Sequence, residues 1–177
     1  IFGGSSGARS INHAIYDLLS DVNDKGEAHA LAGIHFVHQI GKLDYQKFKK
    51  MYEGFRIDLE VKEFIHNMPE ELAKADIVIC RAGVSTIAEI CMCEKAAIFV
   101  PLPWAADNHQ YENAKVLSDA RAAILLEQAD MNSKSLEALI LSLKEEPDLR
   151  FAMQKNLPQF VKENAALKIA QSLQDFT

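Results

Sequence analysis

Residues 77–89 of the sequence read IVICRAGVSTIAE, and this stretch indicates the fold most clearly. The four apolar residues from Ile77 to Cys80 are typical of a strand that is buried on both faces of a parallel sheet. A short turn containing Gly83 follows, and the residues from 86 to 93 are predicted to form a helix. A buried strand that passes directly into a helix is the repeating unit of an open parallel α/β sheet.

The same alternation extends on both sides of this stretch. Further strands are expected at 1–2, 34–40, 57–64, 96–100 and 122–126, and further helices at 8–20, 45–52, 69–75 and 110–119. After residue 126 the pattern predicts helices alone, at 135–143, 148–156 and 160–173. The sequence therefore predicts a doubly wound, Rossmann-like parallel α/β domain over residues 1–126 with a C-terminal helical extension over residues 127–177.

Composition limits the partners of the chain. The 177 residues carry a formal net charge of −6, which argues against nucleic acid as a partner because phosphate backbones bind basic surfaces. No apolar run reaches the roughly 20 residues that span a bilayer. The cysteines Cys80, Cys91 and Cys93 form no disulfide pattern, so we expect a reducing cytoplasm and small, buried, unreactive thiols.

The first strand-to-helix turn, GGSSGA at residues 3–8, follows only two apolar residues, so we expect a truncated first strand and a longer parent protein. In an open parallel sheet such turns lie at the carboxyl edge, where ligands bind. Glycines allow a ligand close to the backbone, and a helix N-terminus attracts anions. The turn therefore predicts phosphate contact, although a tight turn with a serine N-cap would give the same pattern.

The second turn, residues 81–86, has two interpretations. Thr86 and Glu89 match the spacing of a capping box, in which both side chains are purely structural. Alternatively, free N–H groups at residues 84–86 hold a diphosphate while Glu89 accepts hydrogen bonds from a sugar diol. The spacing does not choose between them.

The third turn, residues 101–114, is long and rich in proline, and it carries Trp104, Asp107, Asn108, His109 and Gln110. Polar loops at the ligand edge of a sheet usually bind something, so we favour binding over an exposed loop that ends in an Asp or Asn cap.

No metal site is expected. The sequence lacks an Asp-x-Asp motif, so a transferase that holds its diphosphate through a metal is disfavoured. His35 and His38 lie three apart on a strand and should face opposite sides. His66 and His109 have no evident partner ligands, and no nucleophile elbow is present.

Taken together, the turns resemble those of the MurG family of glycosyltransferases. The similarity covers the glycine turn with Ile11-Asn12, residues 63–68, residues 75–90, and the segment 97–114, in the family's order and spacing. The helical tail matches only in general character.

The resemblance implies a GT-B fold, in which this chain is the C-terminal, UDP-GlcNAc-binding half and an absent half binds a lipid-linked acceptor. It implies metal-independent, inverting transfer of GlcNAc to undecaprenyl-pyrophosphoryl-MurNAc-pentapeptide in peptidoglycan synthesis, with no cofactor besides the donor substrate. It also implies a cytoplasmic protein held peripherally at the inner face of the bacterial plasma membrane, and a fragment that is inactive alone.

The resemblance also assigns roles to residues. The backbone at Ile65 would read the uracil edge, and Glu89 would bind the ribose hydroxyls. The diphosphate would be held by Ser5 and by the backbone of Val84, Ser85 and Thr86. The GlcNAc hydroxyls would be contacted by His109, Gln110 and Asn113. His109 stands where some relatives have Gln, and the residues that activate the acceptor are expected outside this chain.

Four alternatives remain open at this stage. They are another UDP-sugar transferase of the GT-B type such as a glycolipid synthase, the soluble subunit of a two-chain GlcNAc transferase, an epimerase of the same fold, and a non-catalytic UDP-sugar-binding domain. The epimerase is disfavoured because few carboxylates and histidines lie near the expected sugar loop.

Overall fold

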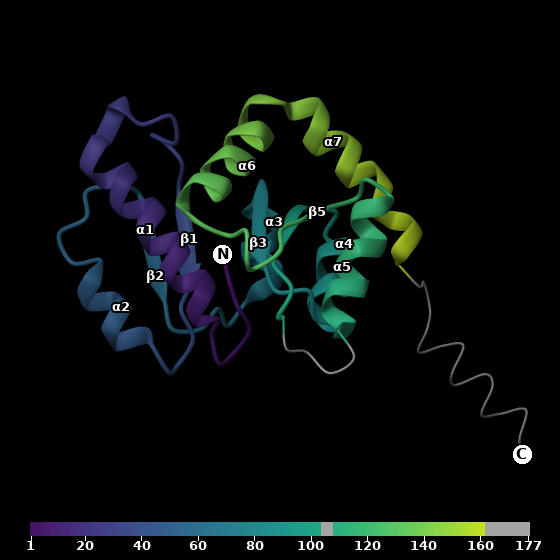
Figure 1. The fold of residues 1–177 in the computed structure, drawn as a ribbon, viewed down its shortest axis with the longest axis horizontal. Helices are drawn as coiled ribbons and strands as arrows, with labels where there is room; N and C mark the ends of the chain where they lie inside the picture. The colour runs from purple at the N-terminus through teal and green to yellow at the C-terminus, as the bar shows by residue number, and fades with distance from the viewer. Residues whose placement is uncertain (104–107, 162–177) are drawn as a thin grey trace, which may run out of the picture.

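A computed structural model describes residues 1–103 and 108–161 of the chain (Figure 1). Its strands are β1 (Phe36–Gln39), β2 (Leu59–Lys62), β3 (Ile77–Cys80), β4 (Ala96–Phe99) and β5 (Ile124–Leu125). Its helices are α1 (Arg9–Lys25), α2 (Tyr45–Met51), α3 (Met68–Lys74), α4 (Val84–Met92), α5 (His109–Asp119), α6 (Ser133–Glu145) and α7 (Pro147–Asn156), with 3-10 turns η1 (Gly26–Ala28) and η3 (Pro158–Phe160).

The strands are parallel and follow the order of a doubly wound sheet. β2 pairs with β1, and β3, β4 and β5 pair in sequence. Phe2 lies between the two groups, with parallel bridges to Gln39 and to Cys80. Counting the Ile1–Phe2 segment as the first strand, the order is third, second, first, fourth, fifth, sixth, which confirms the predicted Rossmann-like fold.

Helices cover both faces of the sheet because alternate strand residues point to opposite sides. On one side, Ile79 and Ile98 join a core with apolar residues of α1, α2 and α6. On the other side, Val78 and Phe99 join a second core with residues of α3, α4 and α5. This two-sided burial explains why β3 and β4 read as continuous apolar runs.

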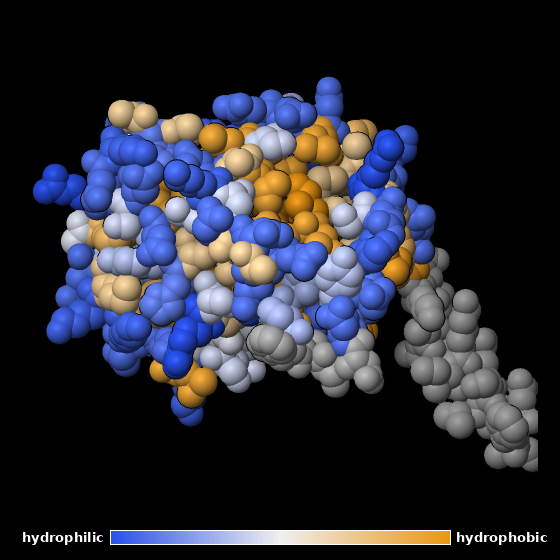
Figure 2. Space-filling view, viewed as in Figure 1, coloured by the Kyte–Doolittle hydropathy of each residue, from blue (hydrophilic) through white to orange (hydrophobic). Residues whose placement is uncertain are grey.

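In the view of Figure 1, the helices that follow β5 pass above the strands. α6 packs on α1, and together α6 and α7 form an arch in Figure 1. Hydrophobic side chains gather beneath this arch in the space-filling view of Figure 2. A capping box starts α6, where the Asn132 side chain accepts hydrogen bonds from the backbone N–H groups of Lys134 and Ser135.

Most predicted elements are present, with shifted ends. α1 runs five residues beyond the predicted end because Val22 continues its buried face, and it stops at Gly26, whose φ is 54°. No strand occurs after residue 126 in the described part, as predicted. Most of the helix predicted at 160–173 lies outside the described residues, and the division at residue 126 stays a prediction. None of the described helices is both long and apolar enough to cross a membrane.

Candidate functional site at the carboxyl edge of the sheet

The glycine turn at residues 3–8 is a tight turn that presents Ser5 to solvent. Gly7 donates its backbone N–H to the carbonyl of Gly4 at 3.1 Å, and Ser5 is exposed within this turn. The N-cap of α1 is Ala8, and no side chain caps the helix. The interpretation of this turn as a serine N-cap is therefore wrong. Both serine hydroxyls stay available at the start of α1.

Two glycines allow the first two strand-end loops to touch. Gly7 and Gly41 have φ values of 83° and 86°. A Cβ added to Gly41 would lie 2.2 Å from the Gly7 nitrogen, and one added to Gly7 would lie 2.1 Å from the Ile40 oxygen. Any side chain at either position would collide with backbone, so the glycine turn is fixed against the loop that follows β1.

The turn after β3 is not closed by a capping box. α4 begins at Val84, two residues earlier than predicted, and its N-cap is Gly83, with no side-chain hydrogen bond to the cap. Thr86 thus lies inside the first turn, so the capping-box interpretation of Thr86 and Glu89 is wrong. The N–H groups of Val84, Ser85 and Thr86 have no intrahelical acceptors, because helix N-termini leave their first donors unpaired.

Glu89 lies one and a half turns into α4 and is exposed. Within the described parts of the chain its carboxylate has no hydrogen bond or ion pair. With the capping role removed, no structural function accounts for this carboxylate.

Ile65 follows β2 and is connected to the glycine turn through a buried glutamine. Gln39, at the end of β1, accepts a hydrogen bond from the Ile65 N–H at 2.8 Å and donates its side-chain N–H to the Gly4 carbonyl at 2.9 Å. The Ile65 N–H is therefore occupied, and only its carbonyl remains to face a ligand. The Gln39 side chain therefore bridges the segment that contains Ile65 and the turn that contains Ser5.

Arg81 joins the remaining turns. One terminal nitrogen, Nη1, donates to the carbonyls of Val100 and Pro101 at 3.0 and 2.9 Å. The other, Nη2, donates to Ser10 Oγ at 2.9 Å and to Gln128 Oε1 at 2.7 Å. The guanidinium thus connects the turn after β3 to α1, to the end of β4 and to the loop after β5.

The third turn is described on either side of residues 104–107, and Trp104 and Asp107 lie outside the described residues. Gln110, in the first turn of α5, accepts a hydrogen bond from the Leu102 N–H at 3.0 Å, so its side-chain oxygen closes this loop. Asn108 is the N-cap of α5, with φ 55°, but its side chain makes no capping bond. The interpretation of an Asn cap is wrong.

Asn113 carries an unpaired donor. Its side-chain nitrogen Nδ2 is buried, and it has no hydrogen-bond partner in the described structure. A buried donor without a partner costs about 1–3 kcal/mol. Asn113 follows His109 by one helical turn, so the two predicted sugar contacts lie on the same side of α5. His109 itself is exposed and takes part in an interaction of its own.

The structure thus brings the predicted residues to one edge. Ser5, Ile65, the α4 N-terminus with Glu89, and the start of α5 all follow the carboxyl ends of strands in the same sheet. Sequence reasoning missed Gln39 and Arg81, which hold these segments together. Arg81 stood in the quoted motif, but its role depends on four acceptors that are distant in sequence.

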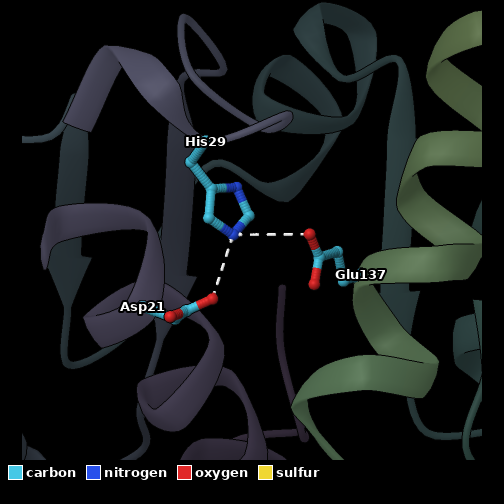
Figure 3. Close-up of side chains that lie close together, drawn as sticks. All are labelled: Asp21, His29 and Glu137. Carbon is cyan, nitrogen blue, oxygen red and sulfur yellow. Dashed lines mark hydrogen bonds and ion pairs between the residues drawn. The ribbon is translucent and has the colours of Figure 1, made fainter. Parts of the chain in front are cut away.

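A buried histidine forms a second cluster, away from this edge (Figure 3). His29 Nε2 lies 3.2 Å from Asp21 Oδ2 and 3.4 Å from Glu137 Oε1, and the three ligand atoms are close enough together to hold a metal ion. However, His29 Nδ1 accepts the Leu31 N–H at 3.0 Å, so the hydrogen of the neutral ring is on Nε2. A metal-bound histidine usually donates from its other nitrogen, so this arrangement favours a clasp between α1 and α6, in which the ring is hydrogen-bonded to Asp21 and lies beside Glu137.

Two further histidines, His35 and His38, and the three cysteines are explained by their exposure and burial. His35 is exposed and His38 fully buried, which confirms that they face opposite sides. Burial raises the pKa of the Cys80 thiol to about 12 and also raises the pKa of Cys91. All three cysteines are unpaired.

A cavity of about 560 Å³ lies at the opposite edge of the sheet. It is lined by residues at the amino ends of β1 and β3 and by parts of α6 and α7, among them Phe36, Ile77, Ile140 and Arg150. None of the predicted site residues lines it. The cavity therefore does not coincide with the carboxyl edge, where the unpaired N–H donors of α4 and the carboxylate of Glu89 lie. We place the functional site at the carboxyl edge because those groups can bind a ligand.

Comparison with known proteins shows the family to which the chain belongs. The glycosyltransferase family 28 C-terminal domain matches residues 1–173. The chain belongs to this family. The family 28 assignment confirms the resemblance predicted from the turns.

Individual relatives of family 28 are also similar. The UDP-N-acetylglucosamine–N-acetylmuramyl-(pentapeptide) pyrophosphoryl-undecaprenol N-acetylglucosamine transferases of Myxococcus xanthus and of an Anaeromyxobacter strain are 38% and 39% identical over 170 residues. This match covers 96% of the chain but only 43% of each relative. The crystal structure of Acinetobacter baumannii MurG superposes with a TM-score of 0.83 at 31% identity, over 98% of this chain and 48% of that one.

Proposed function

We propose that this chain is the donor-binding half of a glycosyltransferase that moves GlcNAc from UDP-GlcNAc to undecaprenyl-pyrophosphoryl-MurNAc-pentapeptide. The observation that carries the proposal is the identity of 38–39%, over 96% of this chain, to two enzymes named for that transfer. The chain spans less than half of those relatives. Acceptor binding and acceptor activation are accordingly assigned to a part of the enzyme outside these 177 residues.

The nucleoside is held at the ends of β1 and β2 in this proposal. The free carbonyl of Ile65 accepts the N3–H of uracil, since its own N–H is occupied by Gln39. A cytosine ring has no hydrogen at that position, so the carbonyl also discriminates between pyrimidines. The exposed carboxylate of Glu89 accepts the ribose hydroxyls, which supplies the partner it otherwise lacks.

The diphosphate is held between two helix N-termini. Ser5 in the glycine turn and the N–H groups of Val84, Ser85 and Thr86 donate to its oxygens. Charge grows on this leaving group as the glycosidic bond breaks, and oriented donors stabilise it without a metal ion. We propose metal-independent, inverting transfer, with no cofactor besides the donor substrate.

The sugar lies against α5. His109, Gln110 and Asn113 contact the GlcNAc hydroxyls, and the buried Nδ2 donor of Asn113 supports this placement because a sugar oxygen would satisfy it. Gln110 donates from its side-chain nitrogen, because its oxygen already holds Leu102. The whole enzyme is proposed to work at the inner face of the bacterial plasma membrane, in contact with its lipid-linked acceptor.

Titration calorimetry of the chain with UDP, ADP and GDP tests this function. We expect UDP to bind at least about tenfold more tightly than either purine nucleotide, a difference of about 1.4 kcal/mol. Equal affinity for ADP would remove the uracil-reading role of Ile65. A parallel titration with UDP-GlcNAc and UDP-glucose separates the GlcNAc transferase from a glycolipid synthase, which would prefer glucose.

A further inference from the structure

Arg81 is held by four neutral acceptors and by no acid. Its two terminal nitrogens donate to Val100 O, Pro101 O, Ser10 Oγ and Gln128 Oε1, all between 2.7 and 3.0 Å. No carboxylate in the described residues forms an ion pair with it. Burial is the cause that shifts the Arg81 pKa, in the downward direction, and an arginine still stays protonated after such a shift. A partly buried positive charge therefore remains without a counterion.

The surroundings of this charge are themselves positive. Ser10 lies in the first turn of α1, and Gly83, two residues after Arg81, caps α4. Helix N-termini carry the positive end of the helix dipole, which favours anions and disfavours cations. Three sources of positive potential thus meet at the carboxyl edge, and an anion bound there would be stabilised by all of them.

The contacts also explain how Arg81 could act without touching a ligand. All four N–H groups on Nη1 and Nη2 are engaged by the protein. The guanidinium fixes the first turn of α1 against the end of β4, from which the loop to α5 departs. Ser10 Oγ in turn donates to Gln128 at 2.7 Å, which extends the same network to the loop after β5.

We propose that Arg81 is a positioning residue for the diphosphate of the nucleotide sugar, which rests on the proposed function. It holds α1, α4 and the β4–α5 loop in register, and its charge adds to the potential of the two helix N-termini. The uracil is proposed to bind at the loops after β1 and β2, to which Arg81 donates no hydrogen bond, so Arg81 acts mainly on the diphosphate and changes uridine binding much less.

The test compares UDP and uridine affinities by calorimetry for the 177-residue chain, for Arg81→Met and for Arg81→Lys. We expect Arg81→Met to weaken UDP binding on the order of tenfold or more, with uridine changed less than about twofold. Arg81→Lys keeps the charge but loses the planar set of guanidinium donors, so its UDP affinity should lie between those of the unmodified chain and of Arg81→Met. The salt dependence of UDP binding should also be shallower in Arg81→Met.

Arg150→Met is the matched control. Arg150 also bonds to backbone carbonyls, those of Leu143 and Lys144 at the end of α6, but at the opposite edge. Its loss should lower Tm and leave the ratio of UDP to uridine affinity unchanged. If Arg81→Met does not fold, Arg81→Lys carries the test through the same ratio.

The outcomes separate the two proposals. A wild-type chain that binds UDP no better than uridine overturns the proposed function and the role of Arg81 with it. A wild-type chain that prefers UDP, with an unchanged ratio in the folded Arg81 variants, overturns the role of Arg81 alone. A parallel loss of UDP and uridine binding assigns Arg81 to general stability and also overturns the proposal.

Discussion

The side-chain oxygen of Gln39 accepts the backbone N–H of Ile65 at 2.8 Å. The same side chain donates to the Gly4 carbonyl, and Gln39 is 1% exposed. One buried amide therefore sets the distance between the loop proposed for the nucleobase and the turn proposed for the diphosphate. Because the Ile65 N–H is bonded to Gln39, only the Ile65 carbonyl is left to bind a ligand.

Replacing Gln39 by Met should cost both stability and UDP affinity. Methionine has a similar shape but leaves the Ile65 N–H and the Gly4 carbonyl without partners, at about 1–3 kcal/mol for each buried group. We expect urea unfolding to show a loss of about 2–4 kcal/mol. UDP and uridine affinities should fall together, unlike the selective loss expected for Arg81→Met. Unchanged affinity in a destabilised variant would mean that the two loops keep their spacing without this bridge.

Glu89→Ala should lose UDP affinity while keeping its stability. The side chain is exposed and takes no part in capping α4, so its removal should change Tm by no more than about 2 °C, as for most surface substitutions. Two hydrogen bonds from ribose hydroxyls to a carboxylate are each worth about 1.5–3 kcal/mol. Glu145→Ala, an exposed acid at the end of α6, is the control. A drop in Tm with wild-type affinity would return Glu89 to a structural role.

Acid should destabilise the fold through His38. Burial lowers the pKa of His38 from 6.5 to about 3 in the folded chain, where its ring contacts Tyr52 and Asn12. Below pH 6.5 the unfolded chain therefore binds a proton that the folded chain does not. Stability should fall by up to about 1.4 kcal/mol per pH unit between 6.5 and 3 from this group.

His38→Gln checks the source of this acid sensitivity. Glutamine does not titrate, so the variant should start less stable but lose stability less steeply between pH 6.5 and 4.5. The measurement is urea unfolding at pH 7.0, 6.0, 5.0 and 4.5 for both chains. Parallel slopes would attribute the acid sensitivity to carboxylates elsewhere.

The His29 clasp should hold α6 without a metal ion. The His29 side chain is 2% exposed and reaches Glu137 on α6. Glu137→Ala should lower stability by no more than about 1 kcal/mol, through the lost 3.4 Å contact between the His29 ring and the Glu137 carboxylate. A zinc ion at 100 times its Kd would add about 2.7 kcal/mol. We expect no such gain in Tm on adding zinc, and a gain that disappears in His29→Ala would show that the ring changes tautomer to bind metal.

The chain alone should not transfer GlcNAc to the lipid-linked acceptor. Holding both substrates together supplies much of an enzyme's rate gain, and the acceptor is proposed to bind outside these residues. The assay follows labelled GlcNAc on undecaprenyl-pyrophosphoryl-MurNAc-pentapeptide, with the chain alone and with the remaining part of a full-length relative added in trans. Weak turnover should occur only in the mixture. Turnover by the chain alone would place the acceptor-activating groups within it.

The sequence predicted the strands and the location of the turns because burial leaves a direct mark on residue type. The continuous apolar run from Ile77 to Cys80 is typical of a strand in a sheet that is covered on both faces. Helix starts were less certain, since the spacing of Thr86 and Glu89 fits a cap equally well. α4 starts earlier because Gly83 takes the extended conformation that a cap requires, with φ −68° and ψ 148°.

The connections within the candidate site could not be predicted. Gln39 reads as a polar residue at the end of a strand, and nothing local shows that Gly4 and Ile65 are its partners. The clasp of Asp21, His29 and Glu137 joins α6 to residues more than 100 positions earlier in the chain. Such contacts follow from the order of the strands, which periodicity alone does not contain.

The Ile1–Phe2 segment carries a consequence for how the domain opens. In the described structure the pairing between β1 and β3 runs through this segment, with the Phe2 N–H donated to Ile79 O and the Ile1 carbonyl accepting the Gln39 N–H. The core on the α6 side crosses this junction, because Ile79 and Ile98 pack there with apolar residues of α1 and α2. The Phe2, Gln39 and Ile98 amides should therefore exchange their hydrogens together, when both groups of strands unfold as one unit.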